Sequence, residues 1–190
     1  LLGADHEDTL ATKLDLAIVL SFGLRDHERG TPLFEEVLAE YRRLYGDEHE
    51  ETLEAMNALG IAYYYQTRYD DAEPLWREAL EVREKRLGDT HPDTMRSLNN
   101  LALLYWSQNR YADAERTYQR AIDSMIKVHG GDHPDTLSAR NNLAVLYNSW
   151  GRTELARALN QDTLERRRRV LGEEHPDTLL SLNNLADNLR

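Results

Sequence analysis

One histidine recurs along this chain at a fixed interval. His49, His91, His133 and His175 each stand 42 residues from the next. Around each lies a copy of the motif that reads Gly-Asp-Thr-His-Pro-Asp-Thr at 88–94, and a looser copy with one extra residue of spacing surrounds His6. A constant period of this length is typical of repeat architectures, in which each unit is one supersecondary structure. The period therefore constrains the fold more than any other feature of the sequence.

Each copy of the motif reads as the boundary between two helices. A glycine such as Gly88 suits the residue after a helix end, and Pro92 suits the first helical turn, where its missing N–H costs nothing. Asp93 in that turn complements the helix dipole. Apolar residues then recur at three- and four-residue steps over 98–105, and again after a short break over 114–125. This spacing predicts two amphipathic helices in every unit.

The predicted helices follow from this pattern. First helices are expected at 7–22, 50–66, 92–107, 134–149 and 176–189, and second helices at 32–45, 70–87, 111–129 and 153–171. A single helix pair cannot bury its apolar stripe, but stacked pairs can. We expect an all-α fold, an α-solenoid in which antiparallel helix pairs form a right-handed superhelix. It would be one domain with repeats at about 4–46, 47–88, 89–130 and 131–172, and a partial repeat at 173–190.

Both ends of the sequence read as cuts through a longer array. Leu2-Gly3 matches the end of a second helix, and the last first helix has no partner helix. Leu182, Leu185 and Leu189 would then present an apolar strip. Such a strip favours association, so we expect weak end-to-end self-association.

Composition narrows the range of partners. The formal net charge is −11 and no cysteine is present. Nucleic acid is not an expected partner, since phosphate-binding surfaces are basic, and no apolar run reaches the roughly 18 residues of a membrane helix. A reducing cytoplasmic location is the simplest expectation. A protein or peptide with basic and apolar residues is the partner that the charge favours.

The small and aromatic positions of each unit resemble a known family. Leu101-Ala102, Tyr105, Ala114, Tyr118 and Ala121 match the spacing of the tetratricopeptide repeat, and the longer unit is similar to the repeats of kinesin light chain. The resemblance covers essentially the whole chain. It implies a helical array whose first helices line a concave groove, where asparagines contact the backbone of a bound peptide.

The same frame predicts the site residues. The expected peptide-binding residues are Asn57, Asn99, Asn100, Asn141, Asn142, Asn183, Asn184, Ile61, Tyr64, Arg96, Leu103, Trp106, Val145 and Asn148. A carboxamide offers a donor and an acceptor together, which suits an extended backbone. Asparagine is also a poor helix former, so its recurrence needs a reason. The alternative is that one asparagine of each pair hydrogen-bonds between neighbouring repeats, and this alternative stays open.

Other motifs are read as structural. The recurrent histidines lie one per repeat, too far apart to share a zinc ion with ligands at about 2 Å, so we expect no metal or other cofactor. Arg166–Arg169 is expected to contact solvent and acidic neighbours. No nucleophile or phosphate-binding motif is present, and we expect no enzyme activity. We expect a protein- or peptide-binding scaffold; the alternative is an architectural or self-association module of a larger signalling protein, such as a kinase or a nucleotide-dependent ATPase.

Overall fold

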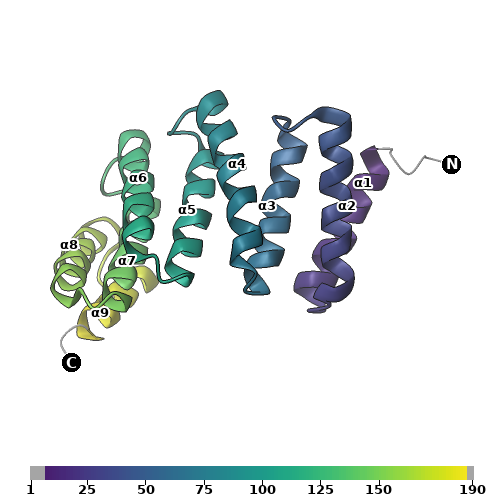
Figure 1. The fold of residues 1–190 in the computed structure, drawn as a ribbon. Coiled ribbons are helices and arrows are strands. Elements are labelled where there is room, and N and C mark those ends of the chain that lie inside the picture. The colour runs from purple at the N-terminus through teal and green to yellow at the C-terminus, as the bar shows by residue number, and fades with distance from the viewer. Residues whose placement is uncertain (1–6, 188–190) are drawn as a thin grey trace. The chain divides into compact units, whose positions relative to one another are not determined.

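The computed structural model describes residues 7–187 of the chain (Figure 1). Expectations that concern Leu2-Gly3, His6 and Leu189 lie outside this range. Between residues 7 and 187 all regular secondary structure is helical. In order, the elements are α1 (Glu7–Ile18), the π-helix η1 (Val19–Gly23), α2 (His27–Tyr45), α3 (Glu50–Tyr65), α4 (Tyr69–Leu87), α5 (Pro92–Ser107), α6 (Tyr111–His129), α7 (Pro134–Ser149), α8 (Thr153–Leu171) and α9 (Pro176–Asp187). The predicted all-α array of helix pairs is confirmed, with most bounds within one residue of those expected.

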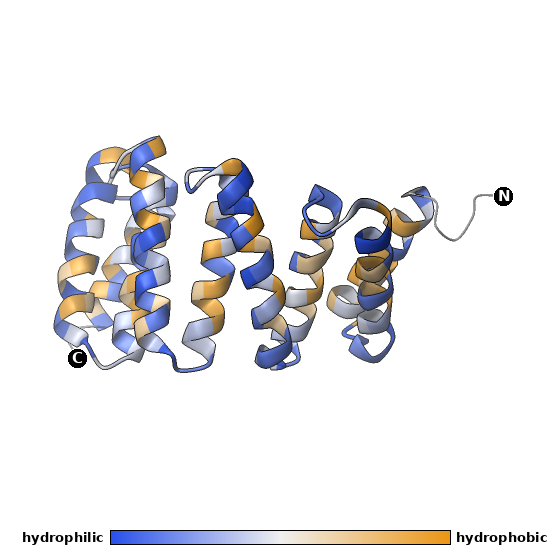
Figure 2. Ribbon diagram, turned by 45° about the horizontal axis from the view of Figure 1, so that its top comes forward, coloured by the Kyte–Doolittle hydropathy of each residue, from blue (hydrophilic) through white to orange (hydrophobic). Residues whose placement is uncertain are grey.

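The helices group into two compact units. Unit 1 runs to Arg86 and unit 2 begins at Leu87, close to a predicted repeat boundary. Within unit 1, α1, α2 and α3 pack in succession, and within unit 2 each helix from α5 to α9 packs on the next. Polar and apolar residues alternate around the individual helices (Figure 2), as expected of helices that are buried on one side.

The recurrent histidines cap the first helices. The Nδ1 atoms of His49, His91, His133 and His175 each accept a hydrogen bond of 3.2–3.3 Å from the backbone N–H two residues further on. This bond satisfies one of the donors that a helix start leaves without a partner. The preceding second helices end at glycines in the left-handed region, with φ between 83° and 92°. The predicted structural role of the connector is therefore confirmed.

Repeat 1 departs from the others in its first helix. The 12 residues of α1 and the 5 of η1 form a helix one residue longer than the 16-residue helices α3, α5 and α7. All four second helices have 19 residues. The extra residue in the spacing of the histidines is thus absorbed by the π-turn, where the N–H of Leu24 donates to the carbonyl oxygen of Val19, five residues earlier.

The start of α2 was predicted incorrectly. We expected it to begin at Pro32, but the helix begins at His27. The carboxylate of Asp26 accepts a 3.2 Å hydrogen bond from the N–H of Arg29 and caps the helix. Aspartate is one of the preferred residues at the N-cap of a helix, and Pro32 is accommodated inside the helix.

Small residues let the paired helices approach closely. In unit 1, Ala72 is fully buried and a Cβ on Gly60 would overlap the ring of Trp76. In unit 2, Ala102 and Ala114 are fully buried in a core shared with Tyr118 and Leu143. Because these positions recur every 42 residues, the same close approach is built into successive repeats.

Candidate functional site

The predicted site residues fall on first helices of both units. Asn57, Ile61 and Tyr64 lie on α3 in unit 1. The others lie in unit 2: Asn99, Asn100, Arg96, Leu103 and Trp106 on α5, Asn141, Asn142, Val145 and Asn148 on α7, and Asn183 and Asn184 on α9.

In unit 1 the structure corrects the prediction for Asn57. This residue is only 8% exposed, so it does not present a carboxamide on an open face as expected. Its backbone oxygen accepts a 3.3 Å hydrogen bond from Nε1 of Trp76. The indole can lie this close because Gly60 has no side chain to exclude it. Close helix packing, which the repeat pattern did not reveal at this position, buries Asn57.

Tyr64 is part of an aromatic cluster in unit 1. Its ring centroid lies 5.6 Å from that of Tyr69, 5.8 Å from that of Tyr65 and 6.0 Å from that of Trp76. Separations of this size are typical of favourable aromatic contacts. Tyr64 and Ile61 are both half-buried, so each keeps some surface that a partner could contact.

In unit 2 the asparagines divide into two kinds. Asn184 Nδ2 donates a 2.7 Å hydrogen bond to Oδ1 of Asn141 and so joins α9 to α7. The side chains of Asn99 and Asn142 have no hydrogen-bond partner among residues 7–187. Asn142 is exposed and Asn99 half-buried. Asn183 on α9 is likewise exposed and has no hydrogen-bond partner in the described part of the chain. The interpretation of inter-repeat bonding thus holds for Asn141 and Asn184, whereas three carboxamides of the predicted ladder are left available.

Apolar side chains accompany these asparagines. Leu103, Trp106 and Val145 are half-buried, and Trp106 packs against the core of unit 2 with its inner part. Partly exposed rings of this kind can anchor a partner's apolar side chain without first moving. The face therefore combines fixed apolar contacts with free carboxamides.

The charges on the predicted face are already engaged. Arg96 donates a hydrogen bond to Asp93 at 3.0 Å, so its charge is already paired and is not reserved for an acidic residue of a partner. Glu54, at the equivalent position in unit 1, accepts a hydrogen bond from Arg83. Local charge thus gives the face less selectivity than the sequence suggested.

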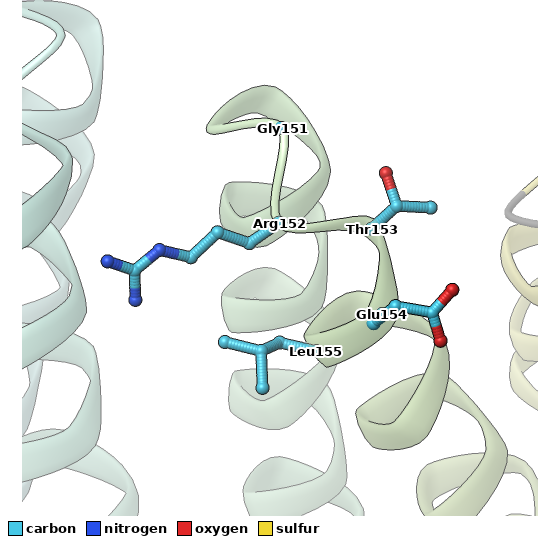
Figure 3. A pocket seen from close by; sticks show the side chains of 5 residues that line it. All are labelled: Gly151, Arg152, Thr153, Glu154 and Leu155. Atoms are coloured by element: carbon cyan, nitrogen blue, oxygen red, sulfur yellow. The ribbon is translucent and has the colours of Figure 1, made fainter.

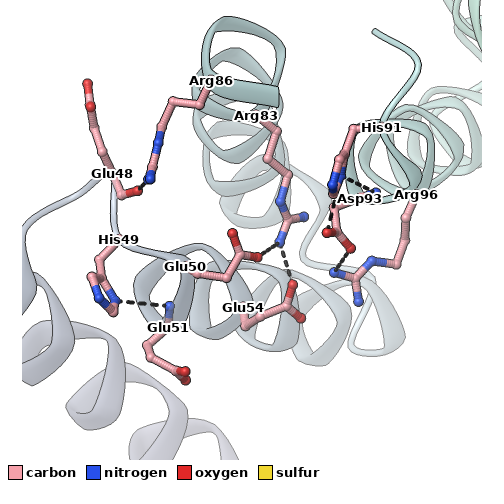
Figure 4. A network of polar contacts seen from close by, with 10 residues as sticks. All are labelled: Glu48, His49, Glu50, Glu51, Glu54, Arg83, Arg86, His91, Asp93 and Arg96. Atoms are coloured by element: carbon pink, nitrogen blue, oxygen red, sulfur yellow. Dashed lines mark hydrogen bonds and ion pairs between the residues drawn. The ribbon is translucent and has the colours of Figure 1, made fainter. Parts of the chain in front are cut away.

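Arg83 is a feature that sequence reasoning missed. Its side chain is fully buried in unit 1, and its guanidinium donates to Glu54 and, at 3.2 Å, to Glu50 (Figure 4). Arg167 takes the equivalent position in unit 2, 84 residues later, and is 2% exposed. One sequence pattern could have revealed them. Arg83 and Arg167 stand 42 residues before and after Met125, so an arginine occupies the position that an apolar residue holds in the repeat between them.

Arg167 has neutral oxygens around its guanidinium. It donates to Ser181 Oγ at 2.8 Å, to the backbone oxygen of Asp177 at 2.9 Å and to Ser138 Oγ at 3.3 Å. Burial lowers the pKa of Arg167, and the nearby Asp177 carboxylate acts in the opposite direction. The side chain holds three helices of unit 2 together.

Arg166 and Arg169, which belong to the same basic segment as Arg167, pair with acidic side chains. Arg166 donates to Asp132 at 2.7 Å and to Asp162, and Arg169 donates to Asp132 at 2.5 Å. These bonds to arginine hold the pKa of Asp132 below its ordinary value. The predicted contact of this run with acidic neighbours is confirmed.

Two tyrosines at equivalent positions of the repeat each donate to a glutamate of the preceding second helix, although the two glutamates lie one helical turn apart in register. Tyr63 Oη donates to Glu35 and Tyr147 Oη donates to Glu115, both at 2.7 Å. Burial, followed by the hydrogen bond to the carboxylate, raises the pKa of each phenol to about 12. These bonds tie first helices to the second helix of the repeat before and are structural.

A shallow hollow of about 380 Å³ lies at the start of α8 (Figure 3). It is lined by Arg152, Leu155 and their neighbours, and the Arg152 guanidinium lies 3.5 Å from the ring centroid of Trp150. The arginine also forms a 3.8 Å ion pair with Glu115. Its charge is therefore occupied, and the hollow offers little to a ligand.

Neither metal sites nor membrane spans are found within residues 7–187. No group of three or more histidine and acidic side chains there could hold a metal ion. None of the helices described is both long and apolar enough to cross a membrane.

Paired helices in a repeating register, with close contacts at small residues, define an array of the helix-pair repeat class. The chain belongs to the tetratricopeptide repeat family, whose model matches residues 8–75, 63–127 and 110–168. Arrays of this family are generally scaffolds for protein interactions.

Solved structures agree with the family. A Podosopora anserina protein with nearly identical TPR-like repeats of the kinesin light chain type is 22% identical, with a TM-score of 0.86 over 99% of this chain and 87% of that one. A second structure of that description gives 23% identity and the same TM-score over 96% and 86% of the two chains. BtubC (BKLC) of P. vanneervenii is 22% identical with a TM-score of 0.76 over 95% and 70%. No curated protein matches the sequence. At these identities the likeness shows the fold alone.

Proposed function

We propose that the chain binds an extended segment of a partner protein along the first-helix face of unit 2. The observation that carries the proposal is the pair of carboxamides on Asn99 and Asn142, which have no partner among the described residues. An extended segment loses water from its own N–H and C=O groups when it binds. A carboxamide can replace both kinds of bond, so these residues would bind backbone without reading sequence.

Selectivity would come from the neighbouring side chains. Leu103, Trp106 and Val145 offer half-buried apolar surface and favour an aliphatic or aromatic anchor on the partner. Since Arg96 is paired with Asp93, the preference for basic residues depends on the net charge of −11. A charge of this size steers basic segments over long range, with an effect that salt weakens.

The test compares two double variants that remove the same chemical groups. Peptides selected from a random 12-residue display library on the wild-type chain are titrated against Asn99→Ala/Asn142→Ala and Asn141→Ala/Asn184→Ala. Each lost bond costs about 0.5–1.5 kcal/mol, so the first variant should bind roughly 5- to 150-fold more weakly. Its thermal stability should not fall, because alanine is the better helix former.

The second variant is the matched control. It removes a hydrogen bond that joins α7 to α9 and no bond to the peptide, so its affinity should stay close to that of the wild type. Equal affinity of the wild type and the Asn99→Ala/Asn142→Ala variant would move the binding site away from this face.

The alternative of a self-association module also has an observation in its favour. On α9, Leu179, Leu180 and Leu182 are 48%, 47% and 42% exposed. Adjacent exposed leucines of this kind are uncommon on a surface without a partner. The two functions can be separated, because the leucines and the free asparagines are different residues.

A further inference from the structure

A pocket in unit 1 lies where repeat 1 departs from the repeat pattern. It has a volume of about 540 Å³ and is lined by Ser21, Phe22, Arg25, His27, Ile61 and Tyr65. Ser21 and Phe22 belong to η1, and Arg25 and His27 follow at the turn into α2. π-turns of this kind are rare and often occur at functional sites. The volume is in the range of roughly 300–1,000 Å³ that small-molecule pockets have.

One part of the pocket wall is apolar. The ring of Phe22 lies 6.0 Å from that of Phe34, which is fully buried, and 5.8 Å from that of Tyr65. Tyr65 is itself 65% exposed, so the pocket rim carries an aromatic ring in contact with solvent. Together with Ile61, these rings form a surface that suits a flat or branched hydrocarbon group.

The polar contact that the pocket offers is not made by Ser21 or His27. Ser21 Oγ and His27 Nδ1 are both shut off from solvent, and a Cβ added to Gly30 of α2 would meet Ser21 Oγ. The Ser21 hydroxyl therefore faces α2, and a ligand in the pocket has Arg25 as its charged contact.

The charge at the pocket is positive. The exposed Arg25 has no ion-pair partner within residues 7–187 and is held in the left-handed region, with φ of 56°. The nearest acid in sequence, Asp26, is occupied by its cap bond to Arg29 and by an ion pair of 3.6 Å with the same residue. The N-terminus of α2 also lies here, and a helix N-terminus favours negative charge.

We propose that this pocket binds a small carboxylate carried on an apolar body. The hydrocarbon part packs between Phe22, Ile61 and Tyr65. The carboxylate pairs with the guanidinium of Arg25, which can donate two parallel hydrogen bonds to it. The peptide surface proposed above lies on α5, α7 and α9, so the two proposals stand or fall separately.

The experiment uses hydrocinnamate as the probe and calorimetric titration of the whole chain as the measurement. Binding should be saturable, and hydrocinnamamide, which has the same ring but no charge, should bind at least about 10-fold more weakly, as expected for loss of a charge-assisted bond. Arg25→Gln should weaken hydrocinnamate to a similar extent and leave the amide unchanged. The control Arg77→Gln removes a charge that is also exposed, with 67% of its side chain in solvent, and that lies on α4 of the same unit, and it should change neither.

A second variant keeps the proposal testable if Arg25→Gln perturbs the turn. Tyr65→Ala removes an aromatic ring that is 65% exposed at the pocket rim, so it should weaken hydrocinnamate and hydrocinnamamide alike while the chain stays folded. Unchanged affinity of Tyr65→Ala for both probes would overturn the proposal. So would equal binding of hydrocinnamate and its amide, or retention of full affinity by Arg25→Gln. Binding of a free C-terminal phenylalanine peptide but not of hydrocinnamate would also overturn it, because the ligand would then be a peptide.

Discussion

Asn184 on α9 donates a 2.7 Å hydrogen bond to the side-chain oxygen of Asn141 on α7, the first helix of the preceding repeat. The two residues stand at neighbouring positions of the same repeat register, 43 residues apart. A side chain that the resemblance assigns to ligand binding is thus used to hold two repeats together. The asparagines of such an array need not all have the same role.

The first prediction concerns the energy of this pair. Asn141→Ala and Asn184→Ala should each lose the bond and gain helix propensity, so the single losses of stability should be small. The coupling between them should be about 0.5–1.5 kcal/mol. Chemical unfolding of the wild type, both single variants and the double variant measures it. Additive effects would show that the hydrogen bond contributes nothing.

A second prediction uses the contact of Gly60 with Trp76. Gly60→Ala places a methyl group inside the indole and should destabilise the chain by about 1–3 kcal/mol. In unit 2 the equivalent positions hold Ala102 and Tyr118, packed in one core. Adding Trp76→Tyr to Gly60→Ala should therefore restore much of the lost stability, as measured by thermal unfolding. If the double variant is no more stable than Gly60→Ala, the two repeats do not share this packing.

The third prediction concerns high pH. The pKa values of Tyr63 and Tyr147 are raised to about 12, whereas an unfolded phenol titrates near about 10. The folded state holds these protons more tightly. The stability they give is therefore fully present below about pH 10 and is lost as the pH rises toward 12.

Ultraviolet titration of the phenolates checks this. Tyr63→Phe and Tyr147→Phe should each remove one late-titrating group. Glu35→Gln should keep the phenol of Tyr63 but move its titration to lower pH, because the carboxylate that accepts the hydrogen bond of the phenol, and whose charge opposes its ionisation, is gone. An unchanged titration in Glu35→Gln would assign the shift to burial alone.

The fourth prediction concerns self-association through α9. Leu179→Gln and Leu182→Gln together should reduce the apparent mass at high protein concentration, since both leucines are nearly half exposed. Sedimentation velocity over a range of concentrations is the measurement. The matched control is Leu155→Gln on α8, where a leucine of 46% exposure stands alone. An equal effect of the control would indicate non-specific hydrophobic association rather than a defined interface.

The sequence predicted the first-helix bounds well because the determining signals are local. His91 and Pro92 mark a helix start within a few residues of themselves, and the structure shows the histidine making the cap. The start of α2 was missed because Asp26, a single capping residue, outweighed the stronger-looking signal of Pro32. The π-turn was also unforeseen, although the extra residue of spacing before His49 was visible.

The sequence by itself thus determined the helices, their register and the family, since the 42-residue period and the caps depend on neighbours along the chain. Only the tertiary structure decided that Asn57 is buried beneath Trp76, that Asn141 is bonded while Asn142 is free, and that Ser21 lines a pocket. Equal spacing gives two residues equal positions on their helices. Which partners those two residues contact depends on the rotation and distance of the next helix. Side-chain volumes at positions such as Gly60 and Ala102 set that rotation and distance, so no local sequence pattern predicts the contacts.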